Sequence, residues 1–233
     1  MRNPIIAALD VPTGAAAVAL VKQVAPVVGA FKIGSELFTS AGPEIVREIR
    51  GLGAAVFLDL KFHDIPNTVA KAVASAAQLE IDMLTVHASG GLAMLKAAEA
   101  AAQAQAKTGR RVPLILGVTV LTSFDSDGLS EIGVQPNVGH QVERLANLAI
   151  ASGLRGLVCS PLEIAALRAF LPAETQLVTP GIRESDDKPD DQKRTLSAKE
   201  ALAAGANWLV IGRPIYAAAN PRAAAEKILS TLQ

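Results

Sequence analysis

The segment that decides the fold is residues 54–68, which reads Ala54-Ala55-Val56-Phe57-Leu58-Asp59-Leu60-Lys61-Phe62-His63-Asp64-Ile65-Pro66-Asn67-Thr68. It begins as an apolar run and ends with charged side chains at Asp59, Lys61 and Asp64. Because side chains alternate along a strand, Asp59 and Lys61 share one face with Phe57, and the apolar residues between them point to the other face. The pattern predicts a strand with one apolar face and one face that carries charged, chemically reactive side chains.

Two interpretations of these charges are open. An isolated Asp-x-Lys pair at a strand end is more often an ion pair that caps the strand than a catalytic group. Here, however, Pro66 ends the strand and suits the first turn of a helix. Such strand-to-helix junctions are where parallel barrels and doubly wound sheets place their chemistry. The segment is therefore a candidate catalytic site.

The rest of the chain alternates short β-rich runs with Ala-rich helical segments. We predict strands near 5–11, 29–35, 54–62, 82–88, 113–121, 156–160, 176–181 and 207–213. We predict helices near 14–25, 42–51, 66–79, 90–107, 138–152, 161–170, 197–204 and 221–232. Eight such pairs in 233 residues fit a closed parallel barrel, which is typically about 250 residues long. The sequence predicts an α/β protein, a (β/α)8 TIM barrel with a single domain over residues 1–233.

A doubly wound open sheet is the alternative fold. Its dinucleotide-binding version requires the pattern G-x-G-x-x-G after the first strand, and this chain has no such pattern there. Pro66, the pair Gly90-Gly91 and Pro161 all lie where predicted strands turn into helices. These positions agree with the predicted alternation of strands and helices.

Composition argues against several classes of partner. The chain has 22 basic and 22 acidic residues, a formal net charge of zero, and 3% aromatic residues. A nucleic-acid or anionic-membrane surface needs concentrated positive charge. We therefore expect no nucleic acid and no membrane as partners, and any basic character must be local.

The single cysteine and the N-terminus indicate the compartment. Cys159 is the only cysteine, so no intramolecular disulfide can form, and its apolar surroundings at 156–160 predict a buried, inert thiol. The apolar stretch 5–9 is too short for a signal peptide, and no apolar run reaches membrane-spanning length. We expect a cytoplasmic protein.

In a barrel, chemistry is expected at the carboxyl ends of the strands. Asp10 ends the first predicted strand, and Lys32 lies in the second. The fourth strand offers His87 and Ser89 at its end. A lone histidine near a strand end is more often a hydrogen-bonded structural residue, so we expect neither His87 nor His63 to act as an acid or base.

The last two strands predict an anion site. Arg183 follows the seventh strand, and Gly212-Arg213 follows the eighth, which is where barrels frequently bind phosphate. A glycine at 212 would let a phosphate approach the backbone. The alternative is that both arginines pair with surface acids. The polar segment 184–194 between them cannot pack, so we expect a solvated loop or a lid.

These residues together make the chain similar to a known enzyme family. It resembles the orotidine 5'-phosphate decarboxylase family over its whole length. The resemblance is carried by Ala8-Leu9-Asp10-Val11, Phe31-Lys32-Ile33-Gly34, the decapeptide 59–68, Val118-Thr119-Val120-Leu121-Thr122-Ser123, Thr179-Pro180-Gly181-Ile182-Arg183 and Ile211-Gly212-Arg213-Pro214. The decapeptide is highly specific, and no functional position departs from the family pattern.

The resemblance implies an activity and an assembly. The family converts orotidine 5'-phosphate to uridine 5'-phosphate and carbon dioxide, the last step of UMP synthesis, without a metal or organic cofactor. It works as a homodimer with active sites shared across the interface. The implied catalytic array consists of Lys32, Asp59, Lys61 and Asp64, with Asp64 and Thr68 reaching into the site of the neighbouring subunit.

The resemblance also implies substrate contacts. Asp10 and Lys32 are expected to hold ribose hydroxyls, and Thr122 is expected to meet the pyrimidine edge. The phosphate is expected at Arg183, Gln192, Gly212 and Arg213. The substrate is also expected to border the rest of the decapeptide, which comprises Leu60, Phe62, His63, Ile65, Pro66 and Asn67.

The chemistry of the residues agrees with this assignment. Loss of carbon dioxide from a ring carbon with no adjacent electron sink leaves a localised carbanion, which needs a cation and then a proton. A Lys61 ammonium flanked by Asp59 and Asp64 suits both roles.

Two rival functions remain open. Sugar-phosphate lyases and aldolases that resemble this family share Asp-x-Lys-x-x-Asp on the third strand, but they bind magnesium and carry an acidic residue where Lys32 stands. A non-catalytic phosphate-binding barrel would need the anion site and could dispense with the charged array. Lys32 disfavours the first rival, and the complete array disfavours the second.

Overall fold

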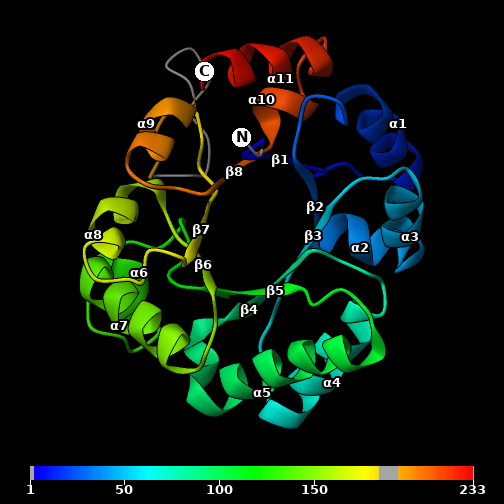
Figure 1. Cartoon of the computed structure of the whole chain (residues 1–233). Coiled ribbons are helices and arrows are strands. Elements are labelled where there is room, and N and C mark those ends of the chain that lie inside the picture. The colour runs from blue at the N-terminus through cyan, green and yellow to red at the C-terminus, as the bar shows by residue number, and fades with distance from the viewer. Residues whose placement is uncertain (1–2, 184–193, 233) are drawn as a thin grey trace.

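The fold is a ring of eight parallel strands surrounded by helices (Figure 1). The computed structural model describes residues 3–183 and 194–232. The strands are β1 Ile5–Ala8, β2 Ala30–Gly34, β3 Val56–Phe62, β4 Met83–His87, β5 Leu114–Val118, β6 Gly156–Val158, β7 Gln176–Thr179 and β8 Trp208–Ile211. They follow one another in chain order around a closed barrel. The predicted (β/α)8 barrel is confirmed, and the open sheet is wrong.

The first strand closes the ring. β1 pairs with both β2 and β8, so that Ile6 lies opposite Ala30 on one side and Val210 on the other. Because all the strands are parallel, their carboxyl ends meet at one mouth of the barrel. Residues that follow strands far apart in the chain are thereby brought together at this mouth.

The predicted strands are placed correctly but extend too far at several carboxyl ends. The run predicted at 5–11 ends at Ala8, and the run predicted at 113–121 ends at Val118. Apolar residues continue beyond both ends, which is why hydrophobicity alone extended the strands. Val11 packs against the core, whereas Val120 lies at the cavity described below.

The helices surround the barrel in the order predicted. They are α1 Gly14–Val24, α2 Ser35–Ala41, α3 Glu44–Gly51, α4 Pro66–Ala77, α5 Gly91–Gln103, α6 Ser126–Glu131, α7 Val138–Ala151, α8 Ile164–Arg168, α9 Ala198–Ala203, α10 Arg213–Tyr216 and α11 Pro221–Ser230, with 3-10 turns η1 Ala88–Gly90, η2 Ala104–Thr108 and η3 Pro161–Glu163. Polar side chains cap several of them, such as Thr13 before α1 and Asn137 before α7. Helix α4 begins at Pro66, as predicted.

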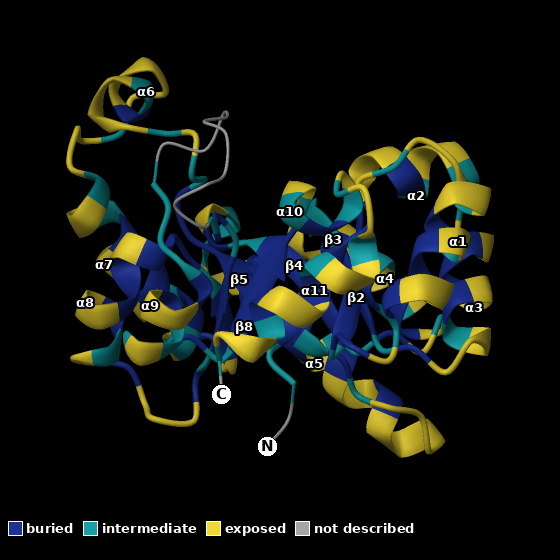
Figure 2. Ribbon diagram, turned by 90° about the horizontal axis from the view of Figure 1, so that it is seen from above, coloured by how far each residue is buried: buried dark blue, intermediate teal, exposed yellow. Residues whose placement is uncertain are grey.

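Sequence patterns did not predict the short helices α2, α6 and α10. Helix α2 ends at Gly42, whose φ of 68° lies in the left-handed region that favours glycine, and Pro43 then precedes α3. Short helices of this kind carry too few turns to show a clear apolar period. Two of them, α6 and α10, follow β5 and β8 and lie on the side of the barrel mouth (Figure 2).

Two apolar layers hold the barrel together. Inside the ring pack Ile6, Ala8, Ala30, Phe57, Met83, Leu116, Val178, Trp208 and Val210. The alternate strand residues, among them Leu58, pack outward against the helices. Phe57 and Leu58 thus point to opposite sides of β3, which confirms the predicted alternation. Figure 2 shows the buried residues concentrated in the strands and on the inner sides of the helices.

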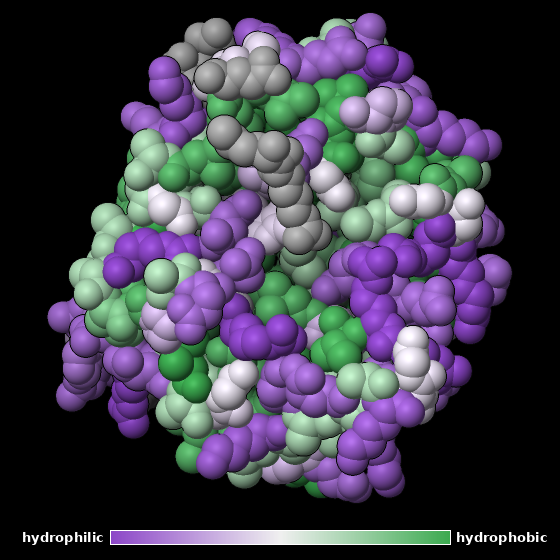
Figure 3. Space-filling model, viewed as in Figure 1, coloured by the Kyte–Doolittle hydropathy of each residue, from purple (hydrophilic) through white to green (hydrophobic). Residues whose placement is uncertain are grey.

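On the face seen in Figure 3, hydrophilic side chains line much of the rim, and apolar side chains form patches among them. Among the described residues, no helix is both long and apolar enough to span a membrane. The large apolar side chains that are exposed lie singly along the chain, as is usual for a protein surface. The most exposed of them is Ile65, at 66%.

Candidate active site

A cavity of about 810 Å³ opens at the carboxyl ends of the strands. Its volume lies in the range of small-molecule sites, roughly 300–1,000 Å³. The predicted site residues that line it are Asp10, Lys32, Asp59, Lys61, Thr122, Arg183, Gly212 and Arg213. Its apolar lining includes Ala8, Phe57, Val118, Val158 and Val210. Residues from β1, β2, β3, β5, β6 and β8, together with the segment after β7, therefore meet at one site.

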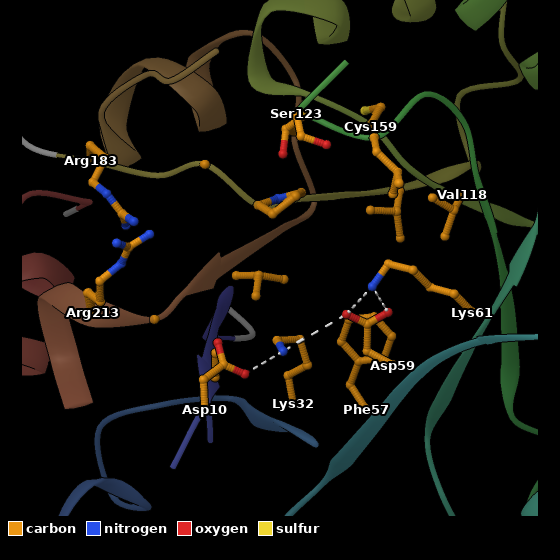
Figure 4. A pocket seen from close by; sticks show the side chains of 18 of the residues that line it. Asp10, Lys32, Phe57, Asp59, Lys61, Val118, Ser123, Cys159, Arg183 and Arg213 are labelled. Atoms are coloured by element: carbon orange, nitrogen blue, oxygen red, sulfur yellow. Dashed lines mark hydrogen bonds and ion pairs between the residues drawn. The ribbon is translucent and has the colours of Figure 1, made fainter. Parts of the chain in front are cut away.

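Four charged side chains form a row along one side of the cavity (Figure 4). Nζ of Lys32 lies 2.9 Å from Oδ1 of Asp10 and 3.9 Å from Oδ2 of Asp59. Nζ of Lys61 donates to both carboxylate oxygens of Asp59, at 2.9 Å each. The row alternates acid and base, so each charge has a neighbour of opposite sign. This pairing is required because the Lys32 and Asp59 side chains are only 12% and 13% exposed.

Gly34 makes room for this row at the end of β2. A Cβ atom at position 34 would lie 3.1 Å from Nζ of Lys32 and 3.4 Å from Oδ1 of Asp10. A side chain there would require the Lys32 head group to move by a few tenths of an ångström. Gly34 also lies opposite Asp59 in the β2–β3 pairing. Gly34, two residues after Lys32, thus leaves room for the two strands to present their charges side by side.

Strand β4 contributes Thr85, which the sequence analysis missed. The Thr85 hydroxyl accepts a hydrogen bond from the backbone N–H of Lys61 and donates one to Oδ1 of Asp59, both at 2.9 Å. Its signal was present in the sequence, because Thr85 is the one polar residue within Met83-Leu84-Thr85-Val86 and shares the inward face with Met83. The polar residues predicted at the end of this strand, His87 and Ser89, do not line the cavity.

Two arginines lie on the β7–β8 side of the cavity. Figure 4 shows the guanidinium groups of Arg183 and Arg213 pointing toward one another. Nη1 of Arg183 also donates to the carbonyl of Ile182 at 2.9 Å. Arg213 is the first residue of α10, directly after β8. Convergent guanidinium groups offer several donors in a planar fork, which suits a phosphate.

Burial sets the protonation of two further groups near the site. Burial, followed by the neighbouring Glu163, raises the pKa of Cys159 to about 12. The thiol is buried, as predicted, and is therefore protonated at neutral pH, although it borders the cavity. Burial, His63 and Lys61 lower the pKa of His87 below its usual value of 6.5. His87 is therefore mainly neutral at neutral pH.

The second half of the decapeptide lies outside the cavity of its own chain. His63, Asp64, Ile65, Pro66, Asn67 and Thr68 are exposed, whereas Leu60 and Phe62 pack against the outer apolar layer. Oδ1 of Asp64 accepts a hydrogen bond from the N–H of Ile65 at 2.6 Å. Within the described residues, Lys61 pairs with Asp59 and not with Asp64. The expected ammonium between two carboxylates is thus not formed within one chain.

Gln192 and the rest of the polar run 184–193 lie outside the described residues. Arg194, expected in the same solvated segment, is instead only 16% exposed. Its guanidinium pairs with the buried Glu163 and donates from Nη2 to the carbonyl of Leu121 at 3.1 Å. Arg194 therefore connects the loops after β5 and β6.

The site combines a cation, a fixed carboxylate and an apolar wall. Asp59 holds Nζ of Lys61, and the Lys61 side chain is 35% exposed. In residues 3–183 and 194–232, no three acidic, histidine or cysteine side chains are grouped closely enough to hold a metal ion. The Lys32 ammonium instead occupies the space between Asp10 and Asp59. Such a site suits stabilisation of an anion at a ligand atom next to Lys61.

Comparisons with known proteins identify the family. Residues 3–228 match the model of the orotidine 5'-phosphate decarboxylase / HUMPS family. The orotidine 5'-phosphate decarboxylase of Opitutus terrae is 52% identical over 233 residues and covers 100% of both chains, and that of Dichelobacter nodosus is 50% identical over 230 residues and covers 99% of both. The crystal structure of the Lactobacillus acidophilus orotidine 5'-phosphate decarboxylase matches with a TM-score of 0.88 and 36% identity, over 99% of each chain. The chain belongs to the orotidine 5'-phosphate decarboxylase / HUMPS family.

Proposed function

We propose that the protein decarboxylates orotidine 5'-phosphate to uridine 5'-phosphate and carbon dioxide without a cofactor. The observation that carries the proposal is the row Asp10, Lys32, Asp59 and Lys61 in the same cavity as the convergent Arg183 and Arg213. The full-length relatives named orotidine 5'-phosphate decarboxylase support it. The reaction would be the last step of UMP synthesis, and we place it in the cytoplasm, since a phosphorylated substrate does not cross membranes unaided.

The substrate would lie across the cavity between these two groups of charges. Its phosphate would bind Arg183 and Arg213, beside the backbone of Gly212. An added Cβ at position 212 would make only ordinary contacts, the nearest at 3.4 Å to Tyr216. The space beside this backbone would thus be open to a phosphate. Gln192 is proposed as a further phosphate ligand from the resemblance alone.

The nucleoside part would reach the charged row. Asp10 and Lys32 would hold the ribose hydroxyls, and Thr122 would meet the pyrimidine edge. All three line the cavity, with Asp10 the most exposed of the row at 43%. This arrangement would put the reacting ring carbon near Lys61 and the apolar wall, away from the phosphate.

Lys61 would act twice in the reaction. As carbon dioxide leaves, the electron pair of the broken bond stays on the ring carbon, and the Lys61 ammonium would stabilise that negative charge. Lys61 would then donate its proton to the same carbon to give the product. Asp59 holds Nζ through two hydrogen bonds of 2.9 Å, so the carboxylate fixes the position of the ammonium.

Repulsion between Asp59 and the substrate carboxylate would contribute less than this stabilisation. Two like charges 4 Å apart at an effective dielectric constant near 20 repel by about 4 kcal/mol. Difficult reactions need on the order of 20 kcal/mol of catalysis. Most of the effect must then come from stabilising the transition state around Lys61, together with phosphate binding energy used to organise the site.

A direct assay tests the proposed reaction. Purified, metal-free protein would be mixed with orotidine 5'-phosphate in the presence of a chelator, and the ultraviolet absorbance change and carbon dioxide release would be followed. We expect full activity. A protein that is active only after magnesium is added back, and only on sugar phosphates, would instead belong with the lyases and aldolases. A protein that binds the nucleotide without turning it over would be a sensor.

The protein is further proposed to be a homodimer whose two active sites share residues. The exposed Asp64, Thr68 and Ile65 lie outside the cavity of their own chain, which supports a role for them at a neighbouring chain. Asp64 would then complete the array around the partner's Lys61. A second chain would also cover Ile65, the most exposed large apolar side chain among the described residues.

Mixed dimers test the shared site. Lys61→Ala and Asp64→Ala proteins, each nearly inactive, would be unfolded together and refolded with different affinity tags. Random pairing makes half of the dimers mixed, and each mixed dimer would contain one intact site, so about one quarter of all sites should recover activity. Each variant refolded alone is the control. Purified mixed dimers that show no gain over these controls would contradict the shared site.

A further inference from the structure

The β3–β4 pairing is irregular at the point where the charged row begins. Leu58 pairs with Leu84 and Phe62 pairs with Val86, so β3 advances four residues while β4 advances two. Thr85 is the single β4 residue that faces this bulge. At the same place Lys61 has a φ of 50°, in the left-handed region that non-glycine residues rarely adopt. A bulge with such a residue is a costly local conformation that its surroundings must hold in place.

Thr85 supplies the contacts that hold it. Its side chain is fully buried. The backbone N–H of Lys61, which the bulge removes from the regular ladder, donates to the Thr85 hydroxyl at 2.9 Å. The same hydroxyl lies 2.9 Å from Oδ1 of Asp59. One buried hydroxyl thus contacts both the backbone of the lysine and the carboxylate that holds its ammonium.

The direction of these two hydrogen bonds is fixed by chemistry. A backbone N–H can only donate, so the hydroxyl must accept from Lys61. An ionised carboxylate can only accept, so the hydroxyl proton must point to Asp59. Oδ1 of Asp59 therefore accepts from two donors, Nζ of Lys61 and the Thr85 hydroxyl. Oδ2 accepts from Nζ of Lys61 at 2.9 Å and forms an ion pair with Nζ of Lys32 at 3.9 Å.

We infer that Thr85 is a positioning residue for the reaction, which acts by fixing the backbone of Lys61 and the carboxylate of Asp59 in one geometry. The inference rests on the proposed function. Thr85 does not line the cavity, so it touches no substrate and acts only through these two residues. Its loss should therefore reduce turnover and leave the affinity for a bound nucleotide unchanged, since the proposed phosphate and ribose ligands lie on other strands.

The test compares three variants with the wild type. Thr85→Val keeps the shape of the side chain but removes the hydroxyl, whereas Thr85→Ser keeps the hydroxyl. Thr119→Val is the matched control, because Thr119 is also a buried threonine. It lies directly after β5, its hydroxyl donates to the carbonyl of Val158 at 3.1 Å, and Thr119 itself does not line the cavity. For each protein, kcat, KM, the Kd of uridine 5'-phosphate and Tm would be measured.

We expect Thr85→Val to lower kcat by about 10- to 100-fold, the effect of losing a hydrogen bond to a charged group. The Kd of uridine 5'-phosphate should stay within about twofold of the wild type, Thr85→Ser should recover most of kcat, and Thr119→Val should keep it. If Thr85→Val does not fold, Thr85→Cys replaces it, because a thiol is a weak donor of similar size and should give the same separation of kcat from Kd.

Several results would overturn the inference. They are a Thr85→Val kcat near that of the wild type, a loss no larger than that of Thr119→Val, a loss confined to nucleotide affinity, and a Thr85→Ser protein as slow as Thr85→Val. A wild type that does not decarboxylate orotidine 5'-phosphate would overturn the proposed function together with this inference. An active wild type with an equally active Thr85→Val protein would overturn the inference alone.

Discussion

Two carboxylates at opposite ends of the barrel have similar partners and different surroundings. Asp59, near the carboxyl end of β3, is bound by Lys61, Lys32 and the Thr85 hydroxyl. Asp82, just before β4, accepts from Arg50 at 3.0 Å, from the backbone N–H of Val56 at 2.8 Å and from Arg111. Both side chains are largely buried, at 13% and 7% exposure.

The place of such a cluster in the barrel and the type of its cation decide what the cluster does. Asp82 ties the start of β3 to α3 and to the segment before β5, and its cations are arginines, which do not give up a proton in proteins. Asp59 faces the cavity, and its cations are lysines, which can transfer protons. Residues at the amino-terminal end of a barrel generally stabilise the fold, whereas catalytic residues lie at the carboxyl ends of the strands.

Loss of the cavity-facing cation should impair turnover more than any other change. Lys61→Ala should lower kcat by at least about 10⁴-fold, because it removes both the stabilising charge and the proposed proton donor. Single-turnover assays would measure the rate, and titration with uridine 5'-phosphate should show retained binding. Lys71→Ala, an exposed lysine on α4, is the control and should be fully active. A Lys61→Ala protein that keeps most of its rate would remove the chemical distinction between the two clusters.

The next largest effect concerns the arginines across the cavity. Arg213→Ala should lower kcat/KM on the order of 100-fold, through both parameters, since phosphate binding energy also organises the site. Steady-state kinetics with orotidine 5'-phosphate would measure this. Orotidine, which lacks the phosphate, should react equally slowly with the variant and the wild type. Arg222→Ala, which breaks only the exposed pair with Glu226 on α11, should change nothing.

Removing the Asp82 carboxylate should lower stability and leave turnover unchanged, the reverse of the effects expected at the cavity. Asp82→Ala should lower the free energy of unfolding by about 3 kcal/mol, because it leaves Arg50 and the N–H of Val56 without their buried acceptor. Urea unfolding would measure the loss, and kcat per folded molecule should be unchanged. Glu44→Ala, which removes an exposed helical pair with Arg47, should cost less than about 0.5 kcal/mol. An Asp82→Ala protein with normal stability and impaired turnover would reverse the assignment of the two clusters.

The smallest effect concerns His87 at the end of β4. Because its pKa is lowered in the folded protein, the unfolded chain binds more protons between the two pKa values. The free energy of unfolding should therefore decrease as pH falls below about 6.5 and level off below the folded pKa. Urea unfolding at several pH values would measure this slope, and His87→Gln should reduce it. His140→Gln, an exposed histidine, is the control and should leave the slope unchanged.

Local sequence patterns were enough to predict the barrel and most of the residues that line the cavity. Alternation along 54–62 determined which face of β3 carries Asp59 and Lys61, because side-chain direction in a strand is a local property. The eightfold alternation of strand and helix then placed Asp10, Lys32, Arg183 and Arg213 at one mouth, since parallel strands end on the same side. Local patterns and one topological rule were sufficient for these residues.

How those residues contact one another depends on packing between elements that are distant in the chain. Thr85 contacts Lys61 because a bulge shifts β3 against β4, and a shift in register between two strands leaves no mark in either strand alone. Asp64 turns away from the cavity because the chain leaves the strand after Phe62, so its distance of three residues from Lys61 says nothing about contact. Arg194 is buried on Glu163 although it ends a polar run, because burial depends on the neighbours that the fold supplies.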